Sequence, residues 1–184
     1  MKIALVHGIN NSLKRSALSP LDAWLEKRGH DTLAVDLPER HWWNARWTTQ
    51  KDAESTLEQI QSRWHDTREV MLVTHSRGAL IANALERRAI FKGIVQFAPA
   101  ASVGHRFLHQ CPIFCVHSRS DGTLILGTML PFGHPFGAAG RRGYDDPCVH
   151  NVEFKGMDHS SYFDKPFIDR SGGYVEYAGK LCGG

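Results

Sequence analysis

Ser76 stands between an apolar run and a run of small residues, in the sequence Thr74-His75-Ser76-Arg77-Gly78. The preceding run Val70–Val73 is typical of a buried central strand, and the following run Ala79–Leu85 is typical of a helix. A serine hydroxyl is a poor nucleophile at neutral pH, so it needs a turn that exposes its oxygen and a base that removes its proton. The pattern supplies the turn and predicts that Ser76 is a nucleophile.

This strand, turn and helix resemble the nucleophile elbow of the α/β-hydrolases, written G-x-S-x-G. Gly78 keeps the second small position, whereas Thr74 stands where the first glycine is usual. The resemblance implies acyl transfer through the serine. It also implies that an acid and then a histidine follow later in the chain, each in a loop after a strand.

Two later segments resemble these loops in that order. The strand-like run Cys111–His117 leads into Ser118–Leu124, which resembles the acid loop H-G-x-x-D-x-x-V and places Asp121 on the acid. The short strand Val152–Phe154 leads into a turn that resembles G-x-x-H and places His159 on the base. The resemblance therefore implies a Ser-His-Asp catalytic triad.

The amino terminus resembles the oxyanion loop of the same family, because a buried strand runs directly into His7-Gly8. Two backbone N–H groups must point at the oxygen that becomes negative in the tetrahedral intermediate. We assign them to Ile9 and Arg77, with Asn10 as the alternative to Ile9. His7 is expected to orient this loop beside the substrate.

Other carboxylates compete with Asp121 for the role of the acid. Asp158 is adjacent to His159 in sequence, which normally directs the two side chains apart. Asp145-Asp146 lie in a polar turn, and Asp36 precedes the nucleophile, which breaks the usual order. We therefore expect Asp121 to orient the histidine, and its alternative role is to cap a turn.

Predicted strands and helices alternate along the chain with short linkers and no internal repeat. This alternation favours an α/β protein with a mostly parallel sheet and helices on both faces, as in an α/β-hydrolase fold with a minimal cap or none. Ser76, Asp121 and His159 then follow the carboxyl ends of strands, where such sheets bind ligands. The predicted helices cover 18–28, 52–64 and 79–85; the strands start with the amino terminus and then cover 32–37, 70–73, 89–97, 111–117 and 152–154.

Length and composition limit what surrounds this site. The 184 residues fit one domain, residues 1–184, with 22 Lys+Arg scattered among 19 Asp+Glu, so a nucleic-acid binder is not indicated. Neither a leader nor a run of about 20 apolar residues is evident, so we expect a cytoplasmic protein without a membrane span. The oligomeric state stays open, and a monomer is one option.

Eleven histidines and four cysteines raise the question of a metal. His105 and His109 have the i, i+4 spacing of a helical ligand pair, but a third ligand at motif spacing is missing, which favours solvated histidines. The cysteines form no C-x-x-C and are expected to be reduced. We predict no metal and no cofactor.

Two segments could line a substrate site. The first, residues 41–47, contains Trp42 and Trp43; the second, residues 127–143, contains Met129 and is rich in glycine and proline. Aromatic and apolar side chains at the mouth of a site can hold acyl chains. The alternative is that the tryptophans cover a sheet edge and that 127–143 is an ordered loop.

The residues together predict a serine hydrolase that cleaves a small carboxylic ester through an acyl-enzyme. A thioesterase, amidase or peptidase would use the same triad. A binding protein on a hydrolase scaffold is the third alternative, because Thr74 could distort the turn and misplace Ser76.

Overall fold

A computed structural model describes residues 1–8, 16–41, 44, 47–124 and 137–183. Its centre is a six-stranded parallel sheet in the order β2-β1-β3-β4-β5-β6. The order reverses direction at β1, as in doubly wound sheets. The strands are β1 (Lys2–Val6), β2 (Asp31–Ala34), β3 (Val70–His75), β4 (Gly93–Phe97), β5 (Ile113–His117) and β6 (Val149–Glu153).

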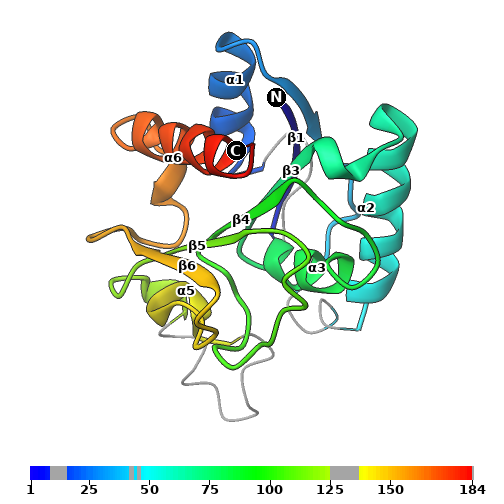
Figure 1. Cartoon of the computed structure of the whole chain (residues 1–184). Helices are drawn as coiled ribbons and strands as arrows, with labels where there is room; N and C mark the ends of the chain where they lie inside the picture. Colours follow the sequence, from blue (N-terminus) through cyan, green and yellow to red (C-terminus); the bar gives the residue numbers. More distant parts are fainter. Residues whose placement is uncertain (9–15, 42–43, 45–46, 125–136, 184) are drawn as a thin grey trace.

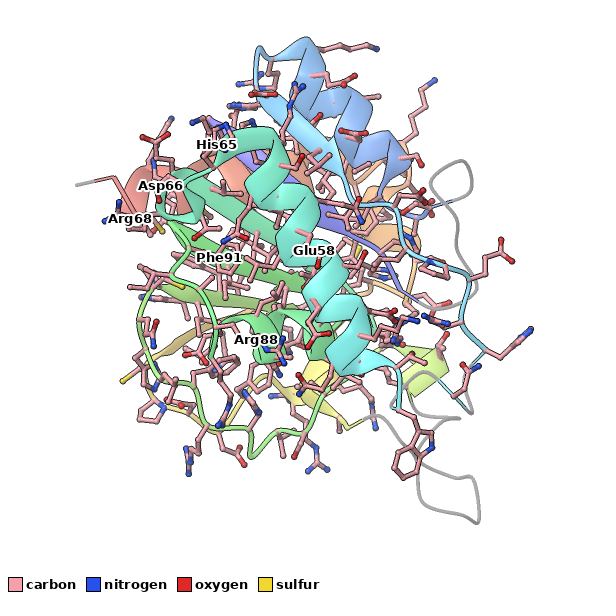
Figure 2. All side chains as sticks on the ribbon, turned by 90° about the vertical axis from the view of Figure 1, so that its right-hand side faces the viewer. Glu58, His65, Asp66, Arg68, Arg88 and Phe91 are labelled. Atoms are coloured by element: carbon pink, nitrogen blue, oxygen red, sulfur yellow. The ribbon has the colours of Figure 1, made fainter. Side chains whose placement is uncertain are left out.

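Helices cover both faces of the sheet (Figure 1). One face carries α1 (Ser19–Lys27) and α6 (Ile168–Leu181); the other carries α2 (Thr49–Trp64), α3 (Gly78–Leu85) and the short α5 (Ala139–Arg142). Figure 2 looks onto α2, which turns Glu58 to solvent, while Phe91, between α3 and β4, is buried. The predicted parallel sheet with helices on both faces is confirmed.

Strand β3 lies in the middle of this arrangement and is buried along its whole length. Alternate side chains of a strand point to opposite faces. Leu72 accordingly packs in the core under α2 and α3, whereas Met71 and Val73 pack in the core under α1 and α6. Each fully buried aliphatic side chain contributes about 1.5–3 kcal/mol. The strand that leads to Ser76 is therefore held firmly from both sides.

The predicted elements are present, and most differ from the structure at their ends. Helix α2 begins at Thr49, three residues before the predicted start, and β4 begins at Gly93 rather than at Ala89. Helix α6 was not predicted. Its Ser171-Gly172-Gly173 stretch has low helix propensity. The position of Gly172 is explained by packing, because a Cβ there would lie 2.4 Å from Cε3 of Trp24.

None of the described helices is both long and apolar enough to cross a membrane. All four cysteines are free, as predicted.

Candidate active site

Ser76 occupies a tight turn between β3 and α3. Its φ of 56° lies in the left-handed region, which is uncommon for a residue other than glycine. Backbone hydrogen bonds hold it there: its N–H donates to the oxygen of Phe97 at 3.0 Å, and its own oxygen accepts from Ala79 at 3.1 Å and from Ala100 at 3.0 Å. Strain of this kind persists only where the surroundings enforce it, and it is frequent at active sites.

Gly78 allows α3 to approach the sheet closely. A Cβ at this position would lie 2.4 Å from the backbone oxygen of Val6 in β1. Thr74, at the position where a glycine is usual, is fully buried and pairs in regular register between Val6 and Gln96. The branched side chain thus fits within an unbroken ladder of β1, β3 and β4.

His159 connects Ser76 and Asp121. Its Nε2 lies 2.8 Å from the Oγ of Ser76, and its Nδ1 lies 2.8 Å from an Oδ of Asp121. Because a carboxylate only accepts, Nδ1 carries the proton and Nε2 is free to accept the proton of the serine hydroxyl. Three residues far apart in sequence therefore form one continuous chain of hydrogen bonds.

Asp121 is fully buried after the carboxyl end of β5. One carboxylate oxygen accepts from His159, and the other accepts from the backbone N–H of Leu124 at 3.1 Å. The carboxylate is therefore fixed by its own loop before it meets the imidazole. Its two oxygens thus contact the imidazole of His159 and a backbone N–H of its own turn.

Asp158 supports the loop of His159 rather than the imidazole. Its Oδ1 accepts from the backbone N–H of His159 at 2.8 Å and from that of Gly122 at 3.2 Å. These two bonds join the histidine loop to the acid loop. Adjacency in sequence predicts that this carboxylate points away from the imidazole, and in the structure its Oδ1 bonds to backbone N–H groups.

His75 contacts the backbone of the loop that carries His159. Its Nε2–H donates to the backbone oxygen of His159 at 2.7 Å, and its ring packs edge-on against Phe163 with centroids 5.4 Å apart. Burial, followed by the neighbouring charge of His159, lowers the pKa of His75 from 6.5 to about 3. It therefore stays neutral and acts as a support within the elbow, not as a second base.

This low pKa predicts a loss of stability in acid. Between pH 6.5 and about 3 the unfolded chain binds a proton at His75 that the folded chain does not bind. The free energy of unfolding should therefore fall as the pH falls through this range, by at most about 1.4 kcal/mol per unit from this group. His75→Gln keeps an N–H donor without titrating, so urea denaturation at several pH values should show a shallower decline. Parallel curves for the two proteins would contradict the assignment.

Gly8 lies directly against Ser76. A Cβ on Gly8 would lie 3.0 Å from Cβ and 3.3 Å from Oγ of Ser76. The buried His7 donates from Nδ1 to the oxygen of Gly8 at 2.9 Å, which fits its predicted role of orienting this loop. The first loop and the elbow therefore meet at the serine oxygen.

Gly8→Ala should crowd this oxygen and slow acylation. Because small misplacements of reacting groups can cost about 100-fold in rate, we expect a loss of roughly 10- to 100-fold. The measurement is the rate of inactivation by a fluorophosphonate, with Gly173→Ala as the control, since a Cβ on Gly173 meets nothing within 4 Å. Equal rates for both variants would show that the loop does not confine Ser76.

Arg77 is the N-cap residue that precedes α3, with its backbone amide one residue after Ser76 and its side chain buried. The guanidinium pairs with Asp52 and donates to Thr48. The other assigned oxyanion donor, Ile9, and its alternative Asn10 lie outside the described residues. The same holds for the predicted substrate contacts Trp42, Trp43 and Met129. The residues that the structure does not describe are 9–15, 42–43, 45–46, 125–136 and 184.

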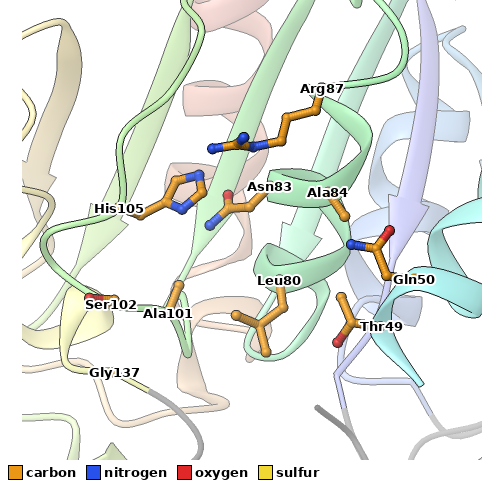
Figure 3. A pocket seen from close by; sticks show the side chains of 10 residues that line it. All are labelled: Thr49, Gln50, Leu80, Asn83, Ala84, Arg87, Ala101, Ser102, His105 and Gly137. Atoms are coloured by element: carbon orange, nitrogen blue, oxygen red, sulfur yellow. The ribbon is translucent and has the colours of Figure 1, made fainter. Parts of the chain in front are cut away.

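A groove of about 570 Å³ runs beside α3 (Figure 3). It begins near the elbow. Its lining residue Ala101 follows Ala100, whose backbone N–H donates to the backbone oxygen of Ser76, and its lining residue Leu80 lies one helical turn after Ser76. Sequence reasoning did not single out this groove, since its walls come from four separate segments without a local motif. Its lining is mixed polar and apolar: Thr49, Gln50, Leu80, Asn83, Ala84, Arg87, Ala101, Ser102, His105 and Gly137.

Among the described residues, one set of side chains could hold a metal ion: His109, Asp146 and Cys148. It lies before β5 and β6, at the opposite end of these strands from Asp121 and His159. The carboxylate of Asp146 already accepts from backbone N–H groups of Cys148 and Phe107 and pairs with His109 at 3.0 Å. His105 is not part of this set, and neither histidine lies in a helix.

Three solved structures show which fold this is. The chain is similar to the monoacylglycerol lipase of Paleococcus ferrophilus, with 15% identity, a TM-score of 0.66, and coverage of 97% of this chain and 94% of the other. It is similar to an esterase of Pyrococcus furiosus, with 13% identity, a TM-score of 0.64, and coverage of 96% and 82%. A Xanthomonas campestris α/β serine hydrolase described as without a lid gives 11% identity, a TM-score of 0.62, and coverage of 98% and 81%.

No protein-family model matches the sequence, and no curated protein matches it significantly. The structural similarities extend over nearly the whole chain at low identity, so they establish the fold. The chain has the α/β-hydrolase fold, as predicted, and its described residues form the sheet and its covering helices without a cap.

Proposed function

We propose that this chain is a serine hydrolase that cleaves a carboxylic ester through Ser76, His159 and Asp121. The observation that carries the proposal is the unbroken contact from the hydroxyl through the imidazole to the buried carboxylate, with both distances at 2.8 Å. The strained turn that presents Ser76 adds support, because such turns expose a nucleophile.

In this mechanism Ser76 attacks the acyl carbonyl while His159 accepts the hydroxyl proton at Nε2. Asp121 holds the imidazole in the required tautomer and stabilises its charged form. The backbone N–H of Arg77 and one from Ile9 or Asn10 stabilise the oxyanion. His159 then returns the proton to the leaving alcohol, and it later activates the water that releases the acid and restores Ser76.

A small ester is the proposed substrate because two similar structures are an esterase and a monoacylglycerol lipase. The mixed lining of the groove beside α3 suits a molecule with apolar and polar parts. The mechanism needs no cofactor. Thioesters, amides and peptides pass through the same acyl-enzyme, so the bond preference is decided by assay.

The assay compares p-nitrophenyl esters of increasing acyl length with a matching thioester and a matching anilide. We expect ester turnover that disappears in Ser76→Ala, with the highest kcat/KM at the acyl length that the site accommodates. Faster turnover of the thioester or anilide would replace the ester with that substrate class. Ester turnover that survives in Ser76→Ala would contradict the proposal.

Thr74→Gly tests the alternative of a binding protein with a distorted elbow. The contact between His159 and Ser76 argues against this alternative, and Thr74 lies in regular register with both neighbouring strands. We therefore expect Thr74→Gly to leave kcat/KM for the ester nearly unchanged. A large gain in activity would show that the threonine compromises the nucleophile.

A further inference from the structure

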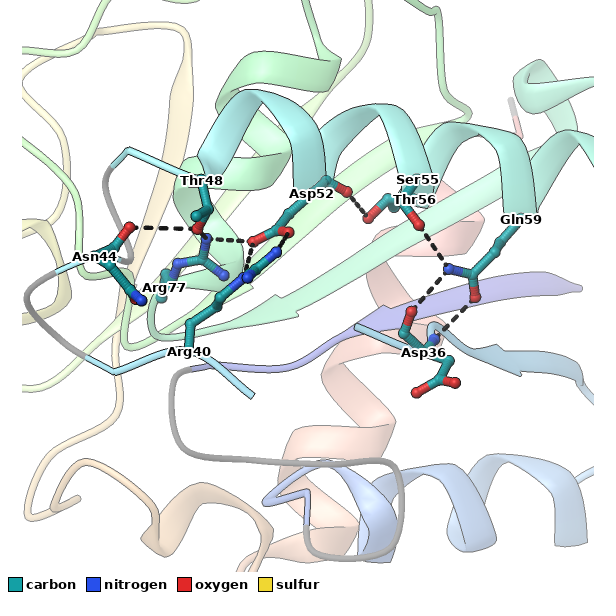
Figure 4. Close-up of polar contacts among 9 residues, drawn as sticks. All are labelled: Asp36, Arg40, Asn44, Thr48, Asp52, Ser55, Thr56, Gln59 and Arg77. Atoms are coloured by element: carbon teal, nitrogen blue, oxygen red, sulfur yellow. Dashed lines mark hydrogen bonds and ion pairs between the residues drawn. The ribbon is translucent and has the colours of Figure 1, made fainter. Parts of the chain in front are cut away.

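The side chain of Arg77 is buried directly beside the nucleophile. It is 2% exposed, and its Nη2 lies 2.5 Å from Oδ2 of Asp52 and 2.9 Å from Oγ1 of Thr48. Arginine is rarely buried unless its charge is paired. Figure 4 shows the guanidinium converging on the carboxylate of Asp52, on the neighbouring helix. The ion pair between Arg77 and Asp52 thus joins the elbow to α2.

Asp52 occupies the first turn of α2 and is also 2% exposed. Its other oxygen accepts from Nη2 of Arg40 at 2.9 Å, so one carboxylate joins two guanidinium groups. Burial alone would raise the pKa of Asp52, but hydrogen bonds from Arg40 and Arg77 lower it below its usual value. The carboxylate therefore stays charged and keeps both partners in place.

The same helix holds the segment between β2 and α2 at a second point. The side-chain amide of Gln59 accepts from the backbone N–H of Asp36 at 2.9 Å and donates to its oxygen at 2.8 Å (Figure 4). Asp52 and Gln59 are seven residues apart, two helical turns, and so share one face of α2. Helix α2 therefore positions the elbow through Asp52 and the segment between β2 and α2 through Gln59.

Resting on the proposed function, we propose that the Asp52–Arg77 ion pair is a positioning device for the oxyanion hole. The guanidinium, held by a rigid helix, fixes the backbone of Arg77, whose N–H is the donor assigned to the oxyanion. An oxyanion donor acts only if it is aimed at the place where negative charge develops. Arg40 supports the pair by sharing the carboxylate, and the three side chains act through the backbone of Arg77.

The test uses two variants and one matched control. Asp52→Asn removes the charge that holds Arg77. The double variant Asp52→Leu/Arg77→Met removes both charges, so that neither is left buried alone, and such replacements often preserve folding. Arg40, whose side chain is 19% exposed, can then reach water. The control is Glu86→Gln, which alters a buried carboxylate that accepts from Leu108 N–H at the far end of α3.

Three quantities are measured: kcat and KM for ester hydrolysis, the melting temperature, and the Ki of an alkyl boronic acid. The boronate adduct on Ser76 is tetrahedral and anionic, so it reports on the oxyanion hole, as transition-state analogues do. We expect kcat to fall roughly 10- to 100-fold and Ki to rise in parallel, with KM changed little. Glu86→Gln should lower the melting temperature without changing kcat or Ki.

A folded double variant with wild-type kcat and Ki would overturn the positioning role, even if Asp52→Asn fails to fold. A fall in kcat without a rise in Ki would overturn it as well. A failure of the proposed function would give a different result, because the wild type itself would show no ester turnover that depends on Ser76. The two failures are therefore distinguishable.

Discussion

Replacing His159 with alanine is expected to lower kcat for ester hydrolysis by about 10⁶-fold, the scale seen when one member of a catalytic triad is removed. The reason lies in the contacts of Nε2, which is 2.8 Å from the hydroxyl of Ser76 and is the group placed to accept its proton. The measurement is steady-state hydrolysis of the preferred p-nitrophenyl ester, with the folded state checked by circular dichroism.

His150→Ala is the control for this prediction. His150 is exposed on β6, and its ring stacks on Phe114 with centroids 5.0 Å apart. We expect its kcat to match the wild type. A His159→Ala protein that is folded and retains wild-type kcat would show that another base activates Ser76.

Asp121→Asn is expected to lower kcat by about 10⁴-fold with little change in KM. The carboxylate accepts from Nδ1 of His159 and thereby leaves Nε2 unprotonated toward Ser76. An asparagine that turns its amide N–H toward Nδ1 would favour the opposite tautomer, with the proton on Nε2. The loss should therefore appear in kcat measured at a saturating concentration of ester. The melting temperature should be affected less strongly than kcat.

Asp158→Asn is the matched control, since it changes the other carboxylate next to His159 in the same way. Asp158 contacts backbone N–H groups of His159 and Gly122, so its loss should loosen the loops without changing the tautomer. We expect its kcat to remain well above that of Asp121→Asn. The reverse order of the two variants would make Asp158 the acid of the triad.

The proximity of Ser76, Asp121 and His159 could be predicted from the sequence because each residue follows a strand that the sequence itself indicates. Ser76, Asp121 and His159 come after β3, β5 and β6, and parallel strands bring their carboxyl ends to one edge. The local order of elements therefore carried the prediction, even though Thr74 departs from the usual elbow. The distances between the side chains required the structure.

Features that depend on packing between distant segments were not predictable in the same way. Helix α6 was missed because glycine has a low helix propensity. The close packing of Gly172 against Trp24, which explains the glycine, is visible only in the structure. The ion pair of Arg77 with Asp52 was missed because charged residues are expected at the surface. Trp47, from the predicted aromatic segment, is 85% exposed, while the groove beside α3 has walls without any local motif.

Covalent labelling by a fluorophosphonate, followed by peptide mass spectrometry, tests the central claim most directly. The account predicts one adduct on the wild type, located on Ser76, and none on Ser76→Ala, because only a serine activated by His159 reacts at neutral pH. A well-folded wild type that is not labelled, or a label on a different residue, would contradict the assignment of Ser76, His159 and Asp121 as a catalytic triad.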